Sequence, residues 1–189
     1  MKLLSIIEPV EKVVGKIHLP VTKRLITGED FYAVQSIIQP GDIVLSRTRL
    51  HLTNACIPEF WKHASIISTR QTIIEAIGEG VVETSLYDFC VSKDYLCVLR
   101  AFNTLYAIQA AVNAAAMIGL NYDYEFEFGD NEFYCSELVY WAQNRAGLQL
   151  NYGKGKILPS SFFHAINKLD LIYVSDSCKN IDIERYRTK

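Results

Sequence analysis

The sequence predicts an α+β protein built around one domain of ordinary size. The chain has 189 residues, half of them hydrophobic, which is enough to bury a single core without disulfides or metals. Strand-like runs come before helical stretches, without the regular alternation of a doubly wound sheet. The strand-like runs cover residues 42–46, 64–68, 72–77, 81–84 and 96–101, and the helical stretches cover 104–119 and 134–145.

The two ends of the chain are interpreted as additions to this domain. We expect an N-terminal helical extension over residues 1–38, a main domain over 39–175 and a C-terminal tail over 176–189. In the extension, apolar residues recur at helical spacing after two candidate capping residues, and Pro40-Gly41 ends the pattern. The caps are Thr27 and Asp30, and the apolar residues are Phe31, Val34, Ile37 and Ile38.

Within the main domain, turn residues separate the predicted elements. The strands at 64–68 and 72–77 flank the polar turn Thr69-Arg70-Gln71, and Gly78 and Gly80 bracket the next bend. The alanine-rich stretch has strong helix propensity and a candidate cap at Asn103 or Thr104, which suits a helix packed in the core. The second helix begins near Tyr134 and is stopped by Gly147.

Composition and charge exclude several classes of function. A net charge of -2 and the lack of a local Lys/Arg cluster argue against a nucleic-acid partner. The five cysteines are an odd number with no C-x-x-C pair, so neither a disulfide framework nor a zinc ribbon is indicated. We expect no metal site and no cofactor. The apolar start of the chain is broken at Glu8 and Pro9, and the stretch 107–120 is too short to span a membrane. A reducing, cytoplasmic compartment fits these features.

Cys135 is the candidate nucleophile. It lies where the polar run 130–134 meets the second helix, and the N–H groups and dipole of a helix start lower the pKa of a thiol. The apolar stripe of that helix turns Cys135 inward, where it could equally be a small core residue. The other cysteines, Cys56, Cys90, Cys97 and Cys178, lack a helix-start setting and are interpreted as structural.

A thiol nucleophile needs a base and a group that orients the base, and His63 and Glu75 are the natural pair. A hairpin loop centred on Thr69 would place them opposite each other on one face of the sheet. A two-residue turn at residues 70–71 would put them on opposite faces, and a loop centred on Gln71 would bring Glu79 opposite His63 instead. The residues alone leave these registers open, and each side chain could also be an ordinary strand residue.

The order of five short motifs resembles the permuted papain-like NlpC-type hydrolases, with the YiiX-like proteins as the closest subgroup and lecithin retinol acyltransferase as a distant relative. The resemblance covers about residues 40–163, and its distinctive feature is that the histidine strand precedes the cysteine helix. The motifs are Gly41-Asp42-Ile43-Val44-Leu45, His63-Ala64-Ser65-Ile66, Glu75-Ala76-Ile77-Gly78-Glu79-Gly80-Val81, Gly119-Leu120-Asn121-Tyr122-Asp123 and Tyr134-Cys135-Ser136-Glu137-Leu138-Val139, followed by Pro159-Ser160-Ser161-Phe162.

This resemblance implies a circularly permuted papain-like fold, with a small antiparallel sheet or half-barrel packed against helices. It implies that Cys135 is the nucleophile, His63 the general base and later the general acid, and Glu75 the orienting group. It also favours the register centred on Thr69 over the one that uses Glu79. Tyr134 could contact the substrate or the oxyanion, or be a packing aromatic at the helix entry.

The implied activity is a cysteine hydrolase, a peptidase or amidase, that cleaves an amide bond through an acyl-enzyme. A lipid-directed acyltransferase or thiol esterase of the same fold is the second possibility. A non-catalytic binding module is the third, and it would hold Cys135 and His63 too far apart, or too blocked, for proton transfer. A small peptide, an amidated amino acid or a lipid ester would each suit the resemblance, with the segment 47–62 helping to form the substrate groove.

Overall fold

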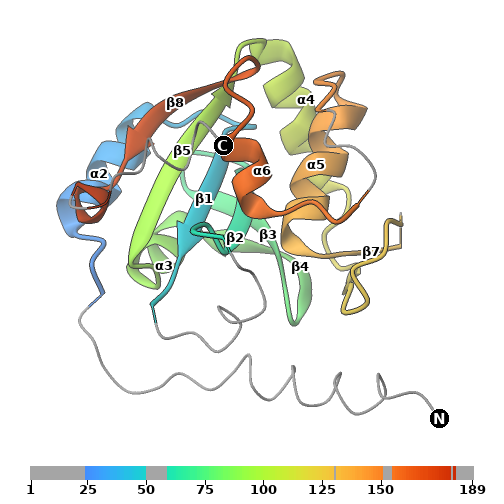
Figure 1. Cartoon of the computed structure of the whole chain (residues 1–189), viewed down its shortest axis with the longest axis horizontal. Coiled ribbons are helices and arrows are strands. Elements are labelled where there is room, and N and C mark those ends of the chain that lie inside the picture. Colours follow the sequence, from blue (N-terminus) through green and yellow to red (C-terminus); the bar gives the residue numbers. More distant parts are fainter. Residues whose placement is uncertain (1–23, 50–58, 130, 151–154, 180, 182–189) are drawn as a thin grey trace.

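The fold is a six-stranded antiparallel sheet between two layers of helices (Figure 1). The computed structural model describes residues 24–49, 59–129, 131–150, 155–179 and 181. The strand order is β4-β3-β2-β1-β5-β8, so the predicted α+β class is confirmed. The strands are β1 (Ile43–Arg47), β2 (His63–Ile67), β3 (Thr72–Ile77), β4 (Gly80–Ser85), β5 (Tyr95–Ala101) and β8 (Leu169–Val174), with β6 (Asn121–Tyr122) and β7 (Glu132–Phe133) forming a separate parallel pair.

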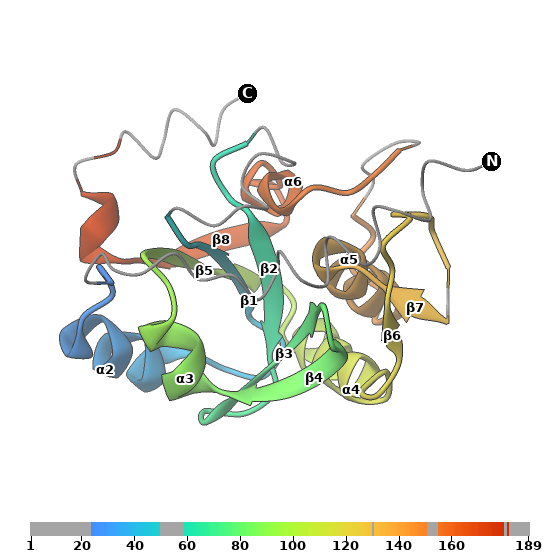
Figure 2. The ribbon, with the colours of Figure 1, turned by 90° about the horizontal axis from the view of Figure 1, so that it is seen from below.

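The helices divide between the two faces of the sheet, as Figure 2 shows. The main core joins one face to helices α4 (Thr104–Ala115), α5 (Cys135–Arg145) and α6 (Pro159–Phe163). A second core joins the other face to α2 (Gly28–Ile37) and α3 (Leu86–Val91). Alternation along each strand divides its residues between these cores: Ile66 faces α5, whereas Ile67 faces α3.

The described ends of the chain pack on the same body. Thr27, one of the two candidate caps, is the N-cap of helix α2, and the other, Asp30, lies in the first turn and completes a capping box with it. Asp30 also accepts hydrogen bonds from the Tyr173 hydroxyl at 2.7 Å and from the Asp176 N–H at 2.9 Å. Asp176 begins a short 3-10 helix, η2 (Asp176–Cys178), whose Cys178 is buried in the main core. Residues 1–23 and 182–189 of the predicted extension and tail lie outside the described residues.

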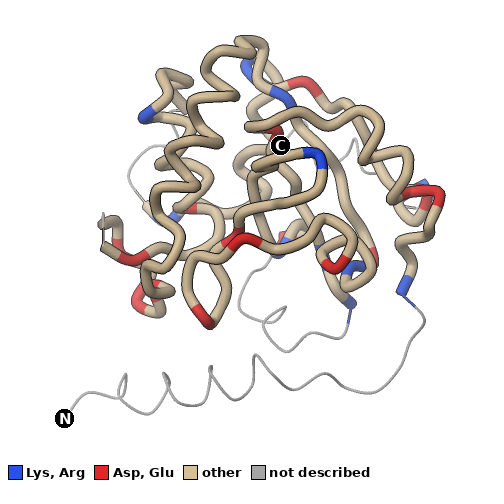
Figure 3. Tube along the Cα trace, turned by 180° about the vertical axis from the view of Figure 1, so that it is seen from behind, with Lys and Arg blue, Asp and Glu red and all other residues tan. Residues whose placement is uncertain are grey.

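Helix α4 packs through alanine and leaves its larger apolar side chains exposed. Ala107, Ala110 and Ala114 are buried, whereas Leu105, Ile108 and Val112 face outward. No charged residue lies on this helix, which is uniformly tan in Figure 3. The alanine-rich pattern predicted a core helix, but it did not distinguish the buried face of this helix from the exposed one. The helix ends at Ala115, whereas the predicted end was Gly119.

Several elements were not predicted. Helix α3, strand β8 and the short strands β6 and β7 were missing from the sequence analysis. Helix α3 begins after Ser85, whose side chain accepts a hydrogen bond from the N–H of Asp88. None of the helices in the described part of the chain combines the length and hydropathy that a membrane span needs.

Candidate active site

The hairpin of β2 and β3 places His63 and Glu75 on the same face of the sheet, but not in the predicted register. Ile66 pairs with Ile74 and Ile67 with Ile73, which centres the loop on Arg70 rather than on Thr69. The predicted register is therefore wrong by two residues. A shift of two preserves the face, so the two side chains are diagonal neighbours instead of directly opposite.

The side chain of Thr69 explains this register. Its Oγ1 accepts hydrogen bonds from the N–H groups of Gln71 and Thr72, both at 3.1 Å. The N–H groups of Ser68 and Thr69 also donate to the carbonyl of Thr72. These contacts fix a three-residue turn, a local geometry that the types of the turn residues alone did not specify.

The sheet opens between β2 and β3 at the end that carries His63. The pairing of these strands stops at Ile66 and Ile74, although β3 continues to Ile77. In an antiparallel ladder alternate residues direct their N–H groups toward the same neighbour, so Ala64, like Ile66, points its N–H toward β3. Helix α5 contacts both strands, and the Ala64 N–H hydrogen-bonds the thiol of Cys135 instead of a strand carbonyl.

His63 is held between Cys135 and Glu75. Its Nε2 lies 2.8 Å from Oε2 of Glu75, and its side chain is 18% exposed. Burial by itself lowers the pKa of His63, but hydrogen bonds with Cys135 and Glu75, together with the negative charge of both groups, raise it to about 9. The imidazole is therefore protonated at neutral pH and donates from Nε2 to the carboxylate.

Glu75 is kept ionised by the same contacts. Burial raises the pKa of its carboxyl, but the hydrogen bond and charge of His63, with smaller contributions from Lys93 and Thr84, lower it to about 2. The Thr84 hydroxyl donates to Oε1 at 2.8 Å, so both carboxylate oxygens have a partner. The carboxylate is thus fixed in the orientation that holds the imidazole.

Cys135 is the first residue of α5 and is 7% exposed. Burial raises the pKa of its thiol, but the hydrogen bond and positive charge of His63 and the hydrogen bond from the Ala64 N–H bring it below the ordinary value. The site therefore places a thiol of lowered pKa beside an imidazolium, with a carboxylate behind it. The contact between Cys135 and His63 differs from the wide separation that is one of the two arrangements expected of a non-catalytic binding module.

The residues on either side of Cys135 anchor it to the segment before α6. The Ser136 hydroxyl donates to the Ile157 carbonyl at 2.7 Å, and the Ile157 N–H donates to the Tyr134 hydroxyl at 3.0 Å. Tyr134 is 2% exposed and packs on Phe126, and burial raises its pKa to about 12. These contacts give Tyr134 the packing and anchoring role that the sequence analysis offered as its second interpretation.

Sequence reasoning missed Thr84, the N–H of Ala64 and Ser136. A signal for Thr84 was present, because the turn Gly78-Glu79 pairs Ile77 with Gly80 and so sets Thr84 diagonal to Glu75 on the same face. Glu79 is not the partner of His63, since Glu75 fills that position. Cys90 and Cys178 are buried free thiols whose pKa values burial raises, as expected of structural cysteines, and Cys56 lies outside the described residues.

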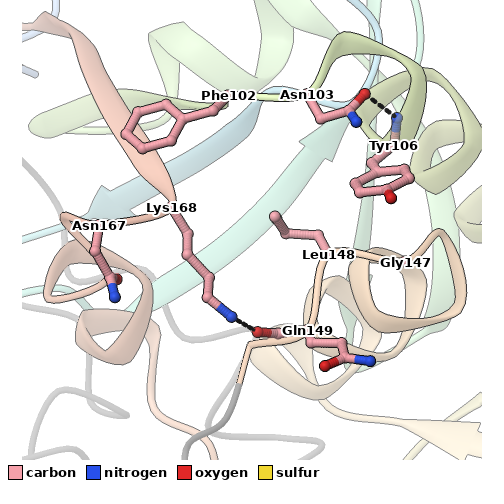
Figure 4. A pocket seen from close by; sticks show the side chains of 8 residues that line it. All are labelled: Phe102, Asn103, Tyr106, Gly147, Leu148, Gln149, Asn167 and Lys168. Carbon is pink, nitrogen blue, oxygen red and sulfur yellow. Dashed lines mark hydrogen bonds between the residues drawn. The ribbon is translucent and has the colours of Figure 1, made fainter.

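A pocket in the described part of the chain lies far from Cys135 (Figure 4). It is lined by the start of α4, the loop after α5 and the turn before β8, where Lys168 hydrogen-bonds the carbonyl of Gln149. The loop residues Gly147 and Leu148 follow the C-terminal end of α5, whereas Cys135 begins that helix. This hollow is therefore separate from the candidate active site.

The fold and the order of the site residues define the class of the protein. A cysteine begins a helix that packs on an antiparallel sheet, and the histidine strand beside it comes earlier in the chain, as in permuted papain-like cysteine hydrolases. The family model described as "Permuted papain-like amidase enzyme, YaeF/YiiX, C92 family" matches residues 37–168, and the chain belongs to this family.

A solved structure supports the fold independently. The crystal structure of the metalloprotein YiiX from Escherichia coli O157:H7 is similar with a TM-score of 0.57 and 20% identity, over 71% of this chain and 96% of that one. In the described residues of the present chain, no group of three or more His, Cys, Asp and Glu side chains is placed to hold a metal ion. A search of curated proteins gives no match.

Proposed function

We propose that the protein hydrolyses an amide bond through the thiolate of Cys135. The observation that carries this proposal is the continuous series of contacts from Cys135 through His63 and Glu75 to Thr84. The contacts with His63 lower the pKa values of Cys135 and Glu75, so they favour ionisation of the nucleophile before substrate binds. Membership of an amidase family supports an amide over an ester as the substrate.

The reaction follows from these positions. The Cys135 thiolate adds to the amide carbonyl carbon, and the oxyanion is stabilised by the Cys135 N–H, which faces outward from the first turn of α5. The C–N bond then breaks as the His63 imidazolium gives its proton to the leaving amine. Neutral His63 next takes a proton from water, the resulting hydroxide equivalent attacks the thioester, and the acid and thiolate are released.

Alkylation tests the ionisation of Cys135 without any knowledge of the substrate. An ordinary thiol with a pKa near 8.5 is only about 0.3% ionised at pH 6. We expect iodoacetamide to label Cys135 at pH 6 roughly tenfold faster than free cysteine, allowing for the weaker nucleophilicity of a low-pKa thiolate. Peptide mapping by mass spectrometry at pH 6 and pH 9 measures the rate. Labelling at pH 6 no faster than free cysteine would contradict the proposal.

The buried thiols of the same chain serve as internal controls for this labelling. Burial raises the pKa values of Cys90 and Cys178, and no histidine acts on either thiol in the described part of the chain, so they should label slowly at both pH values in the folded protein. Both should label fully after unfolding. Fast labelling of these two cysteines at pH 6 would show that the reactivity reports accessibility and not activation by His63.

Glu75→Gln should slow this labelling at pH 6 but not at pH 10. The carboxylate raises the pKa of His63, so its removal lowers that pKa and weakens the imidazolium that stabilises the thiolate. At pH 10 the thiolate forms without help from His63, and the two proteins should react alike. Thr84→Val is the matched control, because it leaves the carboxylate in place and should have a smaller effect. Equal rates for wild type and Glu75→Gln at pH 6 would show that Glu75 does not support the imidazolium of His63.

The carboxylate also links the site to stability. The folded-state pKa of Glu75, about 2, is below its ordinary value of 4.5, so its contribution is present above pH 4.5 and is lost as pH falls toward 2. The pKa of His63 is raised to about 9, so its contribution is present below pH 6.5 and is lost as pH rises toward 9. Both contributions are fully present between pH 4.5 and pH 6.5, so the ion pair of His63 and Glu75 stabilises the fold most in this range.

A further inference from the structure

Asp94, the residue before β5, is a carboxylate held by two arginines, and a third cation, Lys93, precedes it in the chain. Asp94 is fully buried and forms ion pairs with Arg24 at 3.2 Å and with Arg49 at 3.4 Å. It also accepts hydrogen bonds from the backbone N–H groups of Leu25 and Arg49. These four contacts occupy both oxygens of Asp94, whereas the neighbouring residue, Lys93, adds a third positive charge.

The ammonium of Lys93 has no carboxylate partner within ion-pair distance among the residues that the structure describes. It lies over the ring of Phe89, with Nζ 4.6 Å from the ring centroid. Burial and the positive charge of Arg24 lower the pKa of Lys93, although its side chain is only half-buried. The charge of Glu75 acts on Lys93 in the opposite direction, but only from beyond ion-pair distance, and the contact of the ammonium is the face of the Phe89 ring. A cation in this environment gains from an anion that reaches it.

Phe89 brings this cation to the catalytic group. The centroid of its ring lies 6.3 Å from that of His63, so the same fully buried side chain contacts both residues. The charge of Lys93 acts on Glu75 and on Cys135. The described part of the site thus holds a thiolate and a carboxylate that His63 neutralises in part, with an additional cation that no part of the proposed reaction uses.

We propose that Lys93 is a specificity-determining residue that binds a carboxylate of the substrate beside the scissile amide. The substrate class is then an amide that carries a free carboxylate, such as a peptide with an acidic group next to the cleaved bond. This inference rests on the proposed function, because it assigns a substrate preference to the thiolate of Cys135. It predicts that neutral amides of the same size are poorer substrates.

Matched pairs of charged and neutral alkylating reagents test the proposal. Iodoacetate and iodoacetamide, and likewise 3-bromopropionate and 3-bromopropionamide, differ in the charge that they bring to Cys135. The measured quantity is the ratio of alkylation rates, anionic over neutral, at pH 7. A change in the thiol pKa alters both rates equally and cancels in the ratio, so the ratio reports recognition of the carboxylate alone.

In Lys93→Gln we expect this ratio to fall about fivefold for at least one reagent pair, a size typical of a partly exposed ion pair. Lys93→Arg should keep most of the wild-type ratio, because it keeps the charge. Lys168→Gln removes the same charge in the pocket at the far end of α5 and should leave the ratio unchanged. Thermal unfolding of each variant confirms that the folded protein is being compared.

A ratio that stays within twofold of wild type for both reagent pairs in folded Lys93→Gln would overturn the proposal. An equal fall in Lys168→Gln would also overturn it, since the effect would then come from the net charge of the protein. The proposed hydrolase activity is tested separately from the role of Lys93. Alkylation requires only an ionised thiol, and the iodoacetamide rate alone reports whether Cys135 is activated.

Discussion

Cys135→Ala is expected to abolish amide hydrolysis, with a loss of at least about 10³-fold in kcat. Nothing else in the described site can form the acyl-enzyme, because His63 and Glu75 are engaged with each other and the Ser136 hydroxyl donates to the Ile157 carbonyl. Release of the hydrolysis products from a panel of dipeptides and amino acid amides, detected by mass spectrometry, provides the assay. The panel should contain members with and without a second carboxylate.

The control for this substitution is Cys178→Ala, which also removes a buried thiol from the main core but lies in η2, away from His63. It should lower stability slightly and leave kcat close to wild type. If Cys135→Ala retained more than about a tenth of the wild-type rate, the thiolate would not be the nucleophile. Cys135→Ser is also informative, because a hydroxyl beside an imidazolium is not ionised and should be nearly as inactive.

Local patterns in the sequence predicted the candidate nucleophile and the candidate base, but not the opening of the sheet that brings these two side chains together. Helix spacing directed Cys135 inward, and the even separation of His63 and Glu75 allowed a shared face. The contact between thiol and imidazole depends on the early end of the β2–β3 ladder, which frees the Ala64 N–H. That ending is set by the packing of α5 against both strands, a tertiary effect with no signal in either strand alone.

Helix α3 was not predicted, although a local capping pattern marks its start. Ser85 and Asp88 have the spacing of a capping box before an apolar run, and the Ser85 side chain does cap the helix. The helix has only six residues, too few for apolar periodicity to reveal it. Its importance for the site is that Phe89 and the cation at Lys93 both depend on it.

Gly41→Ala is expected to destabilise the fold severely, because β1 begins where α4 comes closest to the sheet. A Cβ on residue 41 would lie 1.8 Å from the carbonyl oxygen of Ala107, and the residue has a φ of +88°. The left-handed backbone costs about 1–2 kcal/mol for a non-glycine residue. Overpacking against a backbone atom commonly adds about 1–3 kcal/mol or more, since neither β1 nor α4 can move freely.

The contacts of Gly41 explain why this strain would reach the active site. Its carbonyl accepts a hydrogen bond from Nε2 of Gln143 on α5 at 3.0 Å, and its N–H donates to Ile67 of β2 at 2.8 Å. Gly41 therefore connects the helix of Cys135 to the strand of His63. Moving α4 away to make room for a methyl group would disturb both elements, so hydrolytic activity should fall along with stability.

Gly119→Ala separates the two causes of the destabilisation. Gly119 has a similar φ of +94°, but no atom lies within 4 Å of the position of its added Cβ. It should therefore show only the backbone cost, with the thermal midpoint falling by about 2–4 °C for each kcal/mol in a chain of this size. Gly41→Ala should fall at least twice as far or fail to fold. Equal shifts in the two variants would mean that the close approach of α4 is relieved by relaxation, and that the left-handed backbone alone requires glycine at position 41.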